Sequence, residues 1–487
     1  MGCAVAHPLL CATRLVKPME VAAESTETLL AGLEAALSRA DPGRPTRLVS
    51  STVEIDPDVD PAALAAGSRL AADRWFCWEQ PDRGFAIGGI GAATAVISRG
   101  EERFADLAER CTRALHDRNA EEPDELPPGA GPVWATGFAF SHRGGSDPLW
   151  SSLPPALAVL PEVSIARGPE GAFLTASIFL EPGTDPDSLM QRAAGRIGAL
   201  RTAVLTPADP HPSAATQIFG RYSPERYERI VAAAVERIRS TEIEKVVLAR
   251  ELTVEAPAAH DSGALFGALR DLFPSCFCFC FGTGQAAFLG ASPELLVRRS
   301  GPVAATVALA GTTARSADPA VDDHLGEAML RSPKVRDEHG IVVRRIERTL
   351  RQHAVWVHSE GQPFVVKVGN LQHLATPIRA QLAESHSAIE LAGFLHPTPA
   401  IGGEPRTPAL ELIRELEGID RGWYTGPVGW MDAAEDGEFC VGLRSALVRD
   451  REAHLFAGCG IVADSDPAAE LQESELKFEA LLPLLAG

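Results

Sequence analysis

The chain has 487 residues, of which 45% are hydrophobic and 23% are charged, as is typical of a globular protein with a substantial core. Acidic residues outnumber basic ones by 65 to 45, which gives a formal net charge of -20. This charge argues against a nucleic-acid or anionic-membrane partner, because phosphate groups require a positive protein surface. We therefore expect any anionic ligand to bind in a local basic pocket.

The start of the chain lacks the features of an export signal or a membrane anchor. It has no charged segment ahead of an apolar run, and His7 and Pro8 interrupt the apolar residues. Ala6 stands where a myristoylation motif has serine or threonine, and no apolar run is long enough to span a bilayer. The nine cysteines are irregularly spaced, as in proteins whose thiols are free. We expect a cytoplasmic enzyme.

Residues 1–210 predict a mixture of short helices and strands. A helix is expected near 26–40, a strand and turn in 84–98, and strands in VWATGFAF and GAFLTASIFL. The glycines Gly88, Gly89 and Gly91 do not complete a GxGxxG motif, so they favour a tight turn within a sheet over a dinucleotide site. The proline-rich segment 205–216 is the best candidate boundary.

After this segment the patterns become stronger. Ser223 and Pro224 predict the start of a helix that runs to about Ser240, and a strand follows from Lys245. Two further strands are expected around a turn that holds Glu294. In SCFCFC the three cysteines alternate, which predicts that they lie on one side of a buried strand rather than around a metal.

Two of these residues are candidates for proton transfer. Lys245 precedes an apolar, β-branched run, where a lysine can act as a base, although a lysine at a strand edge usually keeps its ammonium in water. Glu294 stands between Pro293 and two leucines, where burial can keep a carboxyl group protonated. An exposed turn residue is the equally plausible alternative for Glu294.

A helix near the C-terminus carries three charged residues on one face. Glu470, Glu473 and Lys477 are spaced i, i+3 and i+7, and Glu338 lies in the first turns of another helix. Three carboxylates would suit Mg²⁺, although a solvated helix face explains the same pattern. Just before this helix, Gly458 and Gly460 flank Cys459 and indicate a close approach to the backbone.

Two further residues could bind carboxylates, His373 in HLATP and Arg444 in GLRSALV. Each residue type is more often a structural hydrogen-bond partner.

The order of the short motifs resembles that of the chorismate-utilising enzymes, the family of isochorismate, salicylate, anthranilate and aminodeoxychorismate synthases. The motifs are EKVVLAR, GASPELL, ALAGTTAR, SPKVRDEH, HLATP, LHPTPAIGG, YTGPVGW, LRSALV, AGCGIV and E-x-x-E-x-x-x-K, within residues 216–484. Residues 1–210 match more loosely. The resemblance implies one large α+β domain over 1–487, with two mainly antiparallel sheets flanked by helices, as in anthranilate synthase component I. The break near 210 would then lie inside that domain.

The resemblance also implies roles for individual residues. Lys245 would activate the water that attacks ring carbon C2 of chorismate, and Glu294 would protonate the departing C4 hydroxyl. Mg²⁺ would be held by Glu338 and Glu473, with Glu470 close by or acting through water. Substrate contacts are expected from Gly311, Thr312, His373, Ala400, Tyr424, Arg444, Gly458, Cys459 and Lys477.

The same resemblance narrows the product. Ammonia-using relatives replace the lysine, whereas this chain has Lys245, and no glutamine amidotransferase segment is present. Salicylate synthases usually carry threonine where this chain has Ala400, so isochorismate is the expected product and salicylate with pyruvate the alternative. A non-catalytic chorismate-binding protein is the alternative of another class. We expect a monomer without an amidotransferase partner, and the sequence leaves open a quinone or a siderophore pathway.

Overall fold

Two mainly antiparallel sheets form the framework of the protein in a computed structural model that describes residues 21–39, 47–181, 183–205 and 216–486. The 13-stranded sheet runs β10 (Gln217–Gly220), β11 (Lys245–Glu255), β23 (Glu452–Ile461), β22 (Ser445–Arg449), β13 (Ala287–Ser292), β12 (Phe277–Gly282), β2 (Trp75–Gln80), β3 (Phe85–Ile90), β8 (Val163–Gly168), β9 (Gly171–Phe179), β1 (Leu48–Ile55) and β5 (Arg118–Glu121), with β19 (Gly403–Glu404) on β11. The 10-stranded sheet runs β16 (Ala354–Ser359), β18 (Leu371–Leu382), β15 (Val303–Ala314), β14 (Leu295–Ser300), β21 (Gly437–Val441), β20 (Pro427–Met431), β6 (Trp134–Phe138), β7 (Ala156–Leu160) and β4 (Thr94–Ser98), with β17 (Phe364–Val368) on β18.

Strands from both halves of the chain share each sheet. In the larger sheet β12 pairs with β2, and in the smaller sheet β20 pairs with β6. These pairings confirm the expected α+β fold with two sheets. The proposed break near residue 210 lies in 206–215, outside the described residues.

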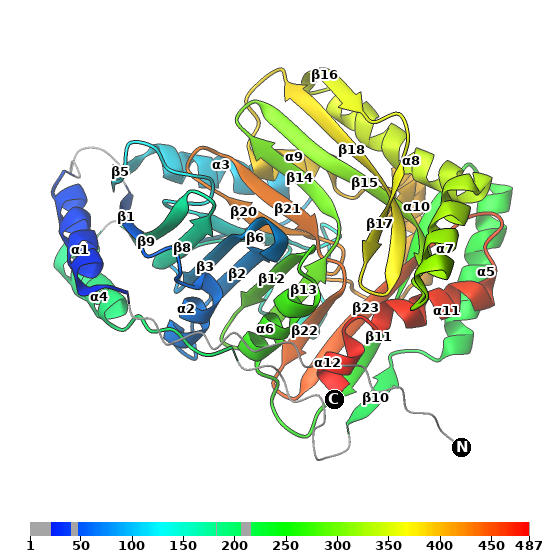
Figure 1. Cartoon of the computed structure of the whole chain (residues 1–487), viewed down its shortest axis with the longest axis horizontal. Helices are drawn as coiled ribbons and strands as arrows, with labels where there is room; N and C mark the ends of the chain where they lie inside the picture. The colour runs from blue at the N-terminus through cyan, green and yellow to red at the C-terminus, as the bar shows by residue number, and fades with distance from the viewer. Residues whose placement is uncertain (1–20, 40–46, 182, 206–215, 487) are drawn as a thin grey trace.

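Helices cover the outer faces of the two sheets (Figure 1). They are α1 (Ala23–Ser38), α2 (Pro61–Ser68), α3 (Arg103–His116), α4 (Pro186–Gly198), α5 (Pro224–Ser240), α6 (Ser262–Leu272), α7 (Pro319–Arg331), α8 (Pro333–Leu350), α9 (Ala388–Leu395), α10 (Arg406–Leu416), α11 (Pro467–Phe478) and α12 (Leu482–Ala486). Among the residues with described positions, no helix is both long and apolar enough to cross a bilayer.

Strand β12 shows how the sequence builds the core. Phe277, Phe279 and Phe281 face an aromatic cluster between the two sheets, whereas Cys278 and Cys280 face the core beneath α1, α2 and α6. This alternation follows from the two-residue period of a strand. The prediction that the cysteines share one side of a buried strand is confirmed, and their thiols are free.

Two predicted turns instead join strands of different sheets. Strand β3 belongs to the larger sheet and β4 to the smaller one, so the expected turn within a sheet at 84–98 is wrong. The chain changes sheets again between β13 and β14, and Glu294 lies in this short connection. Because the connection is short, it holds the Glu294 backbone between the two sheets.

Candidate active site

A cavity of about 120 Å³ lies between β11 and β23 of the larger sheet and β15 and β18 of the smaller one. In Figure 1 these strands lie next to α8 and α11, which supply further side chains. All of the predicted site residues except Glu470 and Cys459 line the cavity. The lining residues that were predicted are Lys245, Glu294, Gly311, Thr312, Glu338, His373, Ala400, Tyr424, Arg444, Gly458, Glu473 and Lys477.

Lys245 forms a buried ion pair at the first position of β11. The residue is 2% exposed, and its Nζ donates a hydrogen bond to Oε1 of Glu338 on α8 at 2.8 Å. Burial alone would raise the pKa of Glu338, but the charge and hydrogen bond of Lys245, together with the charges of Lys477 and Lys334, outweigh burial and lower the pKa below its ordinary value. Glu338 is therefore ionised at neutral pH.

Gly460 leaves room for this ion pair. A Cβ atom at Gly460 would lie 2.8 Å from Cε of Lys245 and 3.0 Å from Oε1 of Glu338. The sequence indicates a close approach at this glycine, and the structure confirms it. The groups that approach the Gly460 backbone are the side chains of Lys245 and Glu338.

Glu294 lies deep in the same cavity and has no charge at neutral pH. It is 5% exposed, and burial raises its pKa to about 8, although Lys245 acts in the opposite direction. Its backbone is fixed, since its N–H donates to Ser292 Oγ at 3.2 Å and its carbonyl accepts from Val441 at 3.1 Å. A fixed, protonated carboxyl group can act as a general acid near pH 7.

His373 and Arg444 form a second pair of cavity residues with defined protonation states. Burial and the charges of Arg444 and Lys477 lower the pKa of His373 to about 3, so the ring is neutral. Arg444 can only donate, so its Nη2 donates to Nε2 of His373 at 3.1 Å. The ring proton must then be on Nδ1, which lies 3.3 Å from the Gly311 carbonyl oxygen.

The arrangement leaves donors available for an anion. Arg444 adopts a φ of 45°, and its buried Nη1 has no hydrogen-bond partner. Gly311, with a φ of 78°, forms a β-bulge between Ala310 and Thr312. A Cβ at Gly311 would lie 2.5 Å from Val335, so a larger residue does not fit. Because bulges leave a residue unpaired, this backbone suits the predicted carboxylate contacts.

Helix α11 contributes a second basic group. Lys477 Nζ lies 2.7 Å from Glu473 Oε1 and donates to the Gly458 carbonyl oxygen at 2.7 Å. Burial disfavours the charge, but Cys459 and Glu473 together outweigh it and raise the pKa of Lys477. Lys477 is therefore an ammonium beside the cavity.

Glu470 and Cys459 are the two predicted site residues that do not line the cavity. Their ligand atoms and that of Glu473 lie within 4.8 Å of one another, and Cys459 Sγ is 3.3 Å from the Glu470 carbonyl oxygen. Burial and the neighbouring Glu473 raise the pKa of Glu470 to about 7. Burial also raises the pKa of the Cys459 thiol, so Cys459 is a poor ligand for a hard cation.

Three carboxylates that the sequence predicts as metal ligands lie at or beside the cavity, although in the described residues only Glu470 and Glu473 of the three belong to a group of ligand atoms within 4.8 Å of one another. Glu338 and Glu473 both line it from different helices, and Glu470 lies beside Glu473. Oxygen donors of this kind are the ligands that Mg²⁺ prefers.

Several residues at or near the cavity were not predicted from the sequence, and three of them make defined contacts. Phe456 lines it and stacks on Tyr424 with ring centroids 5.2 Å apart, two positions before Gly458 on β23. The two-residue period of the strand is a signal that could have identified it. Glu417 and Arg421 form a buried ion pair behind the wall, and no motif indicates their partners.

The chain belongs to the chorismate binding enzyme family, whose model matches residues 35–486. Within that family it is 36% identical over 445 residues to the salicylate biosynthesis isochorismate synthase of Pseudomonas aeruginosa, with 90% of each chain covered. It is 31% identical to the isochorismate synthase MenF of Bacillus subtilis over 90% of this chain and 94% of the relative.

Solved structures give the same assignment. The menaquinone-specific isochorismate synthase MenF of Escherichia coli superposes with a TM-score of 0.77 and 27% identity, covering 95% of this chain and all of its own. Anthranilate synthase component I of Streptococcus pneumoniae, at 18% identity and a TM-score of 0.60, shares the fold.

Changing Gly460 to alanine should impair the reaction without unfolding the protein. The new Cβ forces the flexible ends of Lys245 and Glu338 apart, and misplacement of a catalytic group by about 1 Å costs about a hundredfold in rate. Steady-state kinetics with chorismate measures kcat. Gly195→Ala is the control, since a Cβ there meets nothing within 4 Å. Equal kcat values for the two variants would show that the space at Gly460 is not needed to position Lys245 and Glu338.

Changing Glu294 to glutamine should stabilise the protein at high pH. The folded-state pKa of Glu294, about 8, lies above its ordinary value of 4.5, so ionisation favours the unfolded state. Wild-type stability relative to the variant should be greatest below pH 4.5, fall as the pH rises to about 8, and then stay constant. Each unit of pKa difference is equivalent to about 1.4 kcal/mol. Urea unfolding between pH 5 and 9 tests this, and parallel curves would disprove it.

Proposed function

We propose that this protein is an isochorismate synthase that converts chorismate to isochorismate. One observation carries the proposal: Lys245, a candidate base, and Glu294, a protonated acid, line one cavity. The relatives that align over most of the chain are named isochorismate synthases, which supports the same reaction.

In this mechanism Lys245 takes a proton from a water molecule as the water oxygen bonds to ring carbon C2. Glu294 gives its proton to the C4 hydroxyl, which leaves as water while the ring double bond shifts. One water enters and one leaves, so substrate and product are isomers.

The substrate carboxylates would bind the donors that the fold leaves free. Arg444 Nη1 has no hydrogen-bond partner, and the Gly311 bulge would offer backbone N–H groups to the same ligand. Lys477 and the hydroxyl of Tyr424 border the same space. His373 holds the Arg444 guanidinium in place through its neutral Nε2 atom.

We further propose that Glu338 and Glu473 hold Mg²⁺, with Glu470 beside them. The bound ion would neutralise the ring carboxylate and orient the substrate. Glu470 lies close to Glu473 and has a raised pKa, and both facts support a site that gains stability from a cation.

The small side chain of Ala400, at the position where salicylate synthases usually carry threonine, supports release of isochorismate without pyruvate elimination. A cytoplasmic monomer without an amidotransferase partner remains part of this proposal.

Chromatography of the products formed from chorismate and Mg²⁺ tests the reaction. Wild-type protein should yield isochorismate, and Lys245→Ala should lower kcat by about 10²- to 10⁴-fold, the usual contribution of a general base. Lys367→Ala is the control, because Lys367 pairs with Asp322 and Asp323 outside the cavity. Full activity in Lys245→Ala would refute its role, and salicylate with pyruvate as main products would refute the assigned product.

The metal site is tested by calorimetric titration of Mg²⁺ into the protein. Glu473→Gln should weaken binding at least about tenfold, because one charged ligand is lost. Glu475→Gln, on the same helix but paired with Arg250, is the matched control. Unchanged affinity in Glu473→Gln would place the ion elsewhere.

A further inference from the structure

A second and larger cavity, of about 460 Å³, lies behind the loop 396–401. It is lined by the start of α3, the loop 140–146, the end of α9, α10 and the loop 417–422. His396 and Pro397 line this cavity, whereas Ala400 and Ile401 line the active-site cavity. The two cavities therefore lie on either side of one short loop.

Arg103 is a buried cation without a counter-ion in this cavity. It is 6% exposed, and its Nη2 donates to the Ala139 carbonyl oxygen at 3.1 Å. Its Nε has no hydrogen-bond partner, and none of the described acidic residues forms an ion pair with it. Burial and Arg406 lower its pKa to about 10, which still leaves the guanidinium charged at neutral pH. An uncompensated buried charge is costly, so an anion here would be stabilising.

Arg406 adds a second unpaired guanidinium to the same cavity. It is half-buried at the first position of α10 and has no hydrogen bond or ion pair with any described residue. Arg103 likewise begins α3, and neither helix has a side-chain cap at its N-terminus. Two positive helix ends therefore meet the cavity together with two free guanidinium groups.

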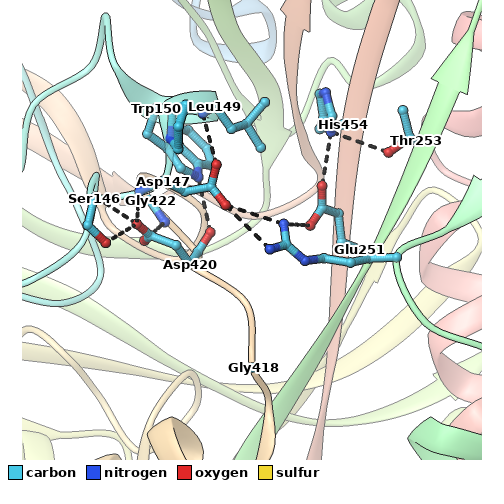
Figure 2. Close-up of polar contacts among 12 residues, drawn as sticks. Ser146, Asp147, Leu149, Trp150, Glu251, Thr253, Gly418, Asp420, Gly422 and His454 are labelled. Atoms are coloured by element: carbon cyan, nitrogen blue, oxygen red, sulfur yellow. Dashed lines mark hydrogen bonds and ion pairs between the residues drawn. The ribbon is translucent and has the colours of Figure 1, made fainter.

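Two acidic residues that line the inner part of this cavity, Glu417 and Asp420, already have partners. Glu417 pairs with Arg421 and accepts the Ala249 N–H at 2.7 Å. Asp420 accepts from the backbone of Ser146, Asp147 and neighbouring glycines, as part of the network in Figure 2. They are not free to neutralise Arg103 or Arg406. Glu101 and Glu102 are exposed at the rim.

The remaining lining is largely apolar and aromatic, with Phe104, Phe140, Phe394, Leu410 and Ile413. The Arg103 guanidinium lies 4.7 Å from the centre of the Phe104 ring. We propose that this cavity is a second ligand site, which binds a small aromatic carboxylate through Arg103 and Arg406. Guanidinium groups match carboxylate geometry, and the rings suit a flat apolar body.

The same site contacts the wall of the active-site cavity. Arg421 lines the second cavity, and its guanidinium donates to the carbonyl oxygens of Ile401 at 2.9 Å and Val247 at 2.8 Å. Val247 and Ile401 both line the active-site cavity. A ligand in the second cavity would thus touch the residue that supports this wall.

Calorimetric titration with benzoate, and with benzamide as its uncharged analogue, tests the second site. Wild-type protein should bind benzoate at least about tenfold more tightly than benzamide, since a charged hydrogen bond contributes about 1.5–3 kcal/mol. Arg103→Met and Arg406→Gln should each weaken benzoate binding at least about tenfold. If Arg103→Met does not fold, the benzoate affinity of Arg406→Gln alone tests the proposal.

Arg444→Met separates this site from the active-site cavity. Benzoate affinity should be unchanged in Arg444→Met, whose substitution lies in the active-site cavity. Loss of binding only in Arg444→Met, or equal affinity in the wild type and both second-site variants, would overturn the proposal. Neither outcome depends on turnover of chorismate, so the proposed function is tested separately.

Discussion

The active-site cavity depends on one largely buried ion pair, Lys245 on β11 of the larger sheet with Glu338 on α8. Removing two charges from water costs several kcal/mol for each ion, so both must be paired and closely surrounded. The larger sheet supplies the lysine from β11, α8 supplies the glutamate, and Gly460 on β23 leaves the space between them. Because a buried pair tolerates little displacement, the relative position of these elements is fixed, and with it the shape of the cavity.

Burial alone does not decide which groups in this cavity carry a charge. Glu338 and Glu294 are both withdrawn from water, but the pKa falls for the glutamate bonded to Lys245 and rises for the one without such a bond. His373 is neutral because Arg444 and Lys477 add to the effect of burial. One site therefore holds a carboxylate, a carboxylic acid and a neutral imidazole at the same pH. This division of protonation states is what acid–base chemistry on a single substrate requires.

The sequence predicts local structure and the motif residues well, and long-range relations poorly. Helix α5 and strand β11 follow from a Ser-Pro start, a helical period and an apolar run, all of which are local. The passage of the chain from one sheet to the other at Glu294 depends on pairing with distant strands, which no local pattern specifies. Likewise, Arg421 is buried against backbone carbonyl groups far away in the chain, and Arg103 and Arg406 meet only in the folded protein. The order of the motifs identified most of the cavity residues. Only the folded structure shows that Glu470 and Cys459 do not line the cavity.

In the proposed reaction, Lys245 directs a solvent water to ring carbon C2 while Glu294 releases the C4 hydroxyl. Turnover of chorismate in water enriched in oxygen-18, followed by mass spectrometry of the isochorismate and its fragments, measures where the new oxygen comes from. This reaction places one labelled oxygen in each isochorismate molecule, in the C2 hydroxyl. Isochorismate without label would contradict it, because the hydroxyl would then have moved within the substrate and no activated water would be needed.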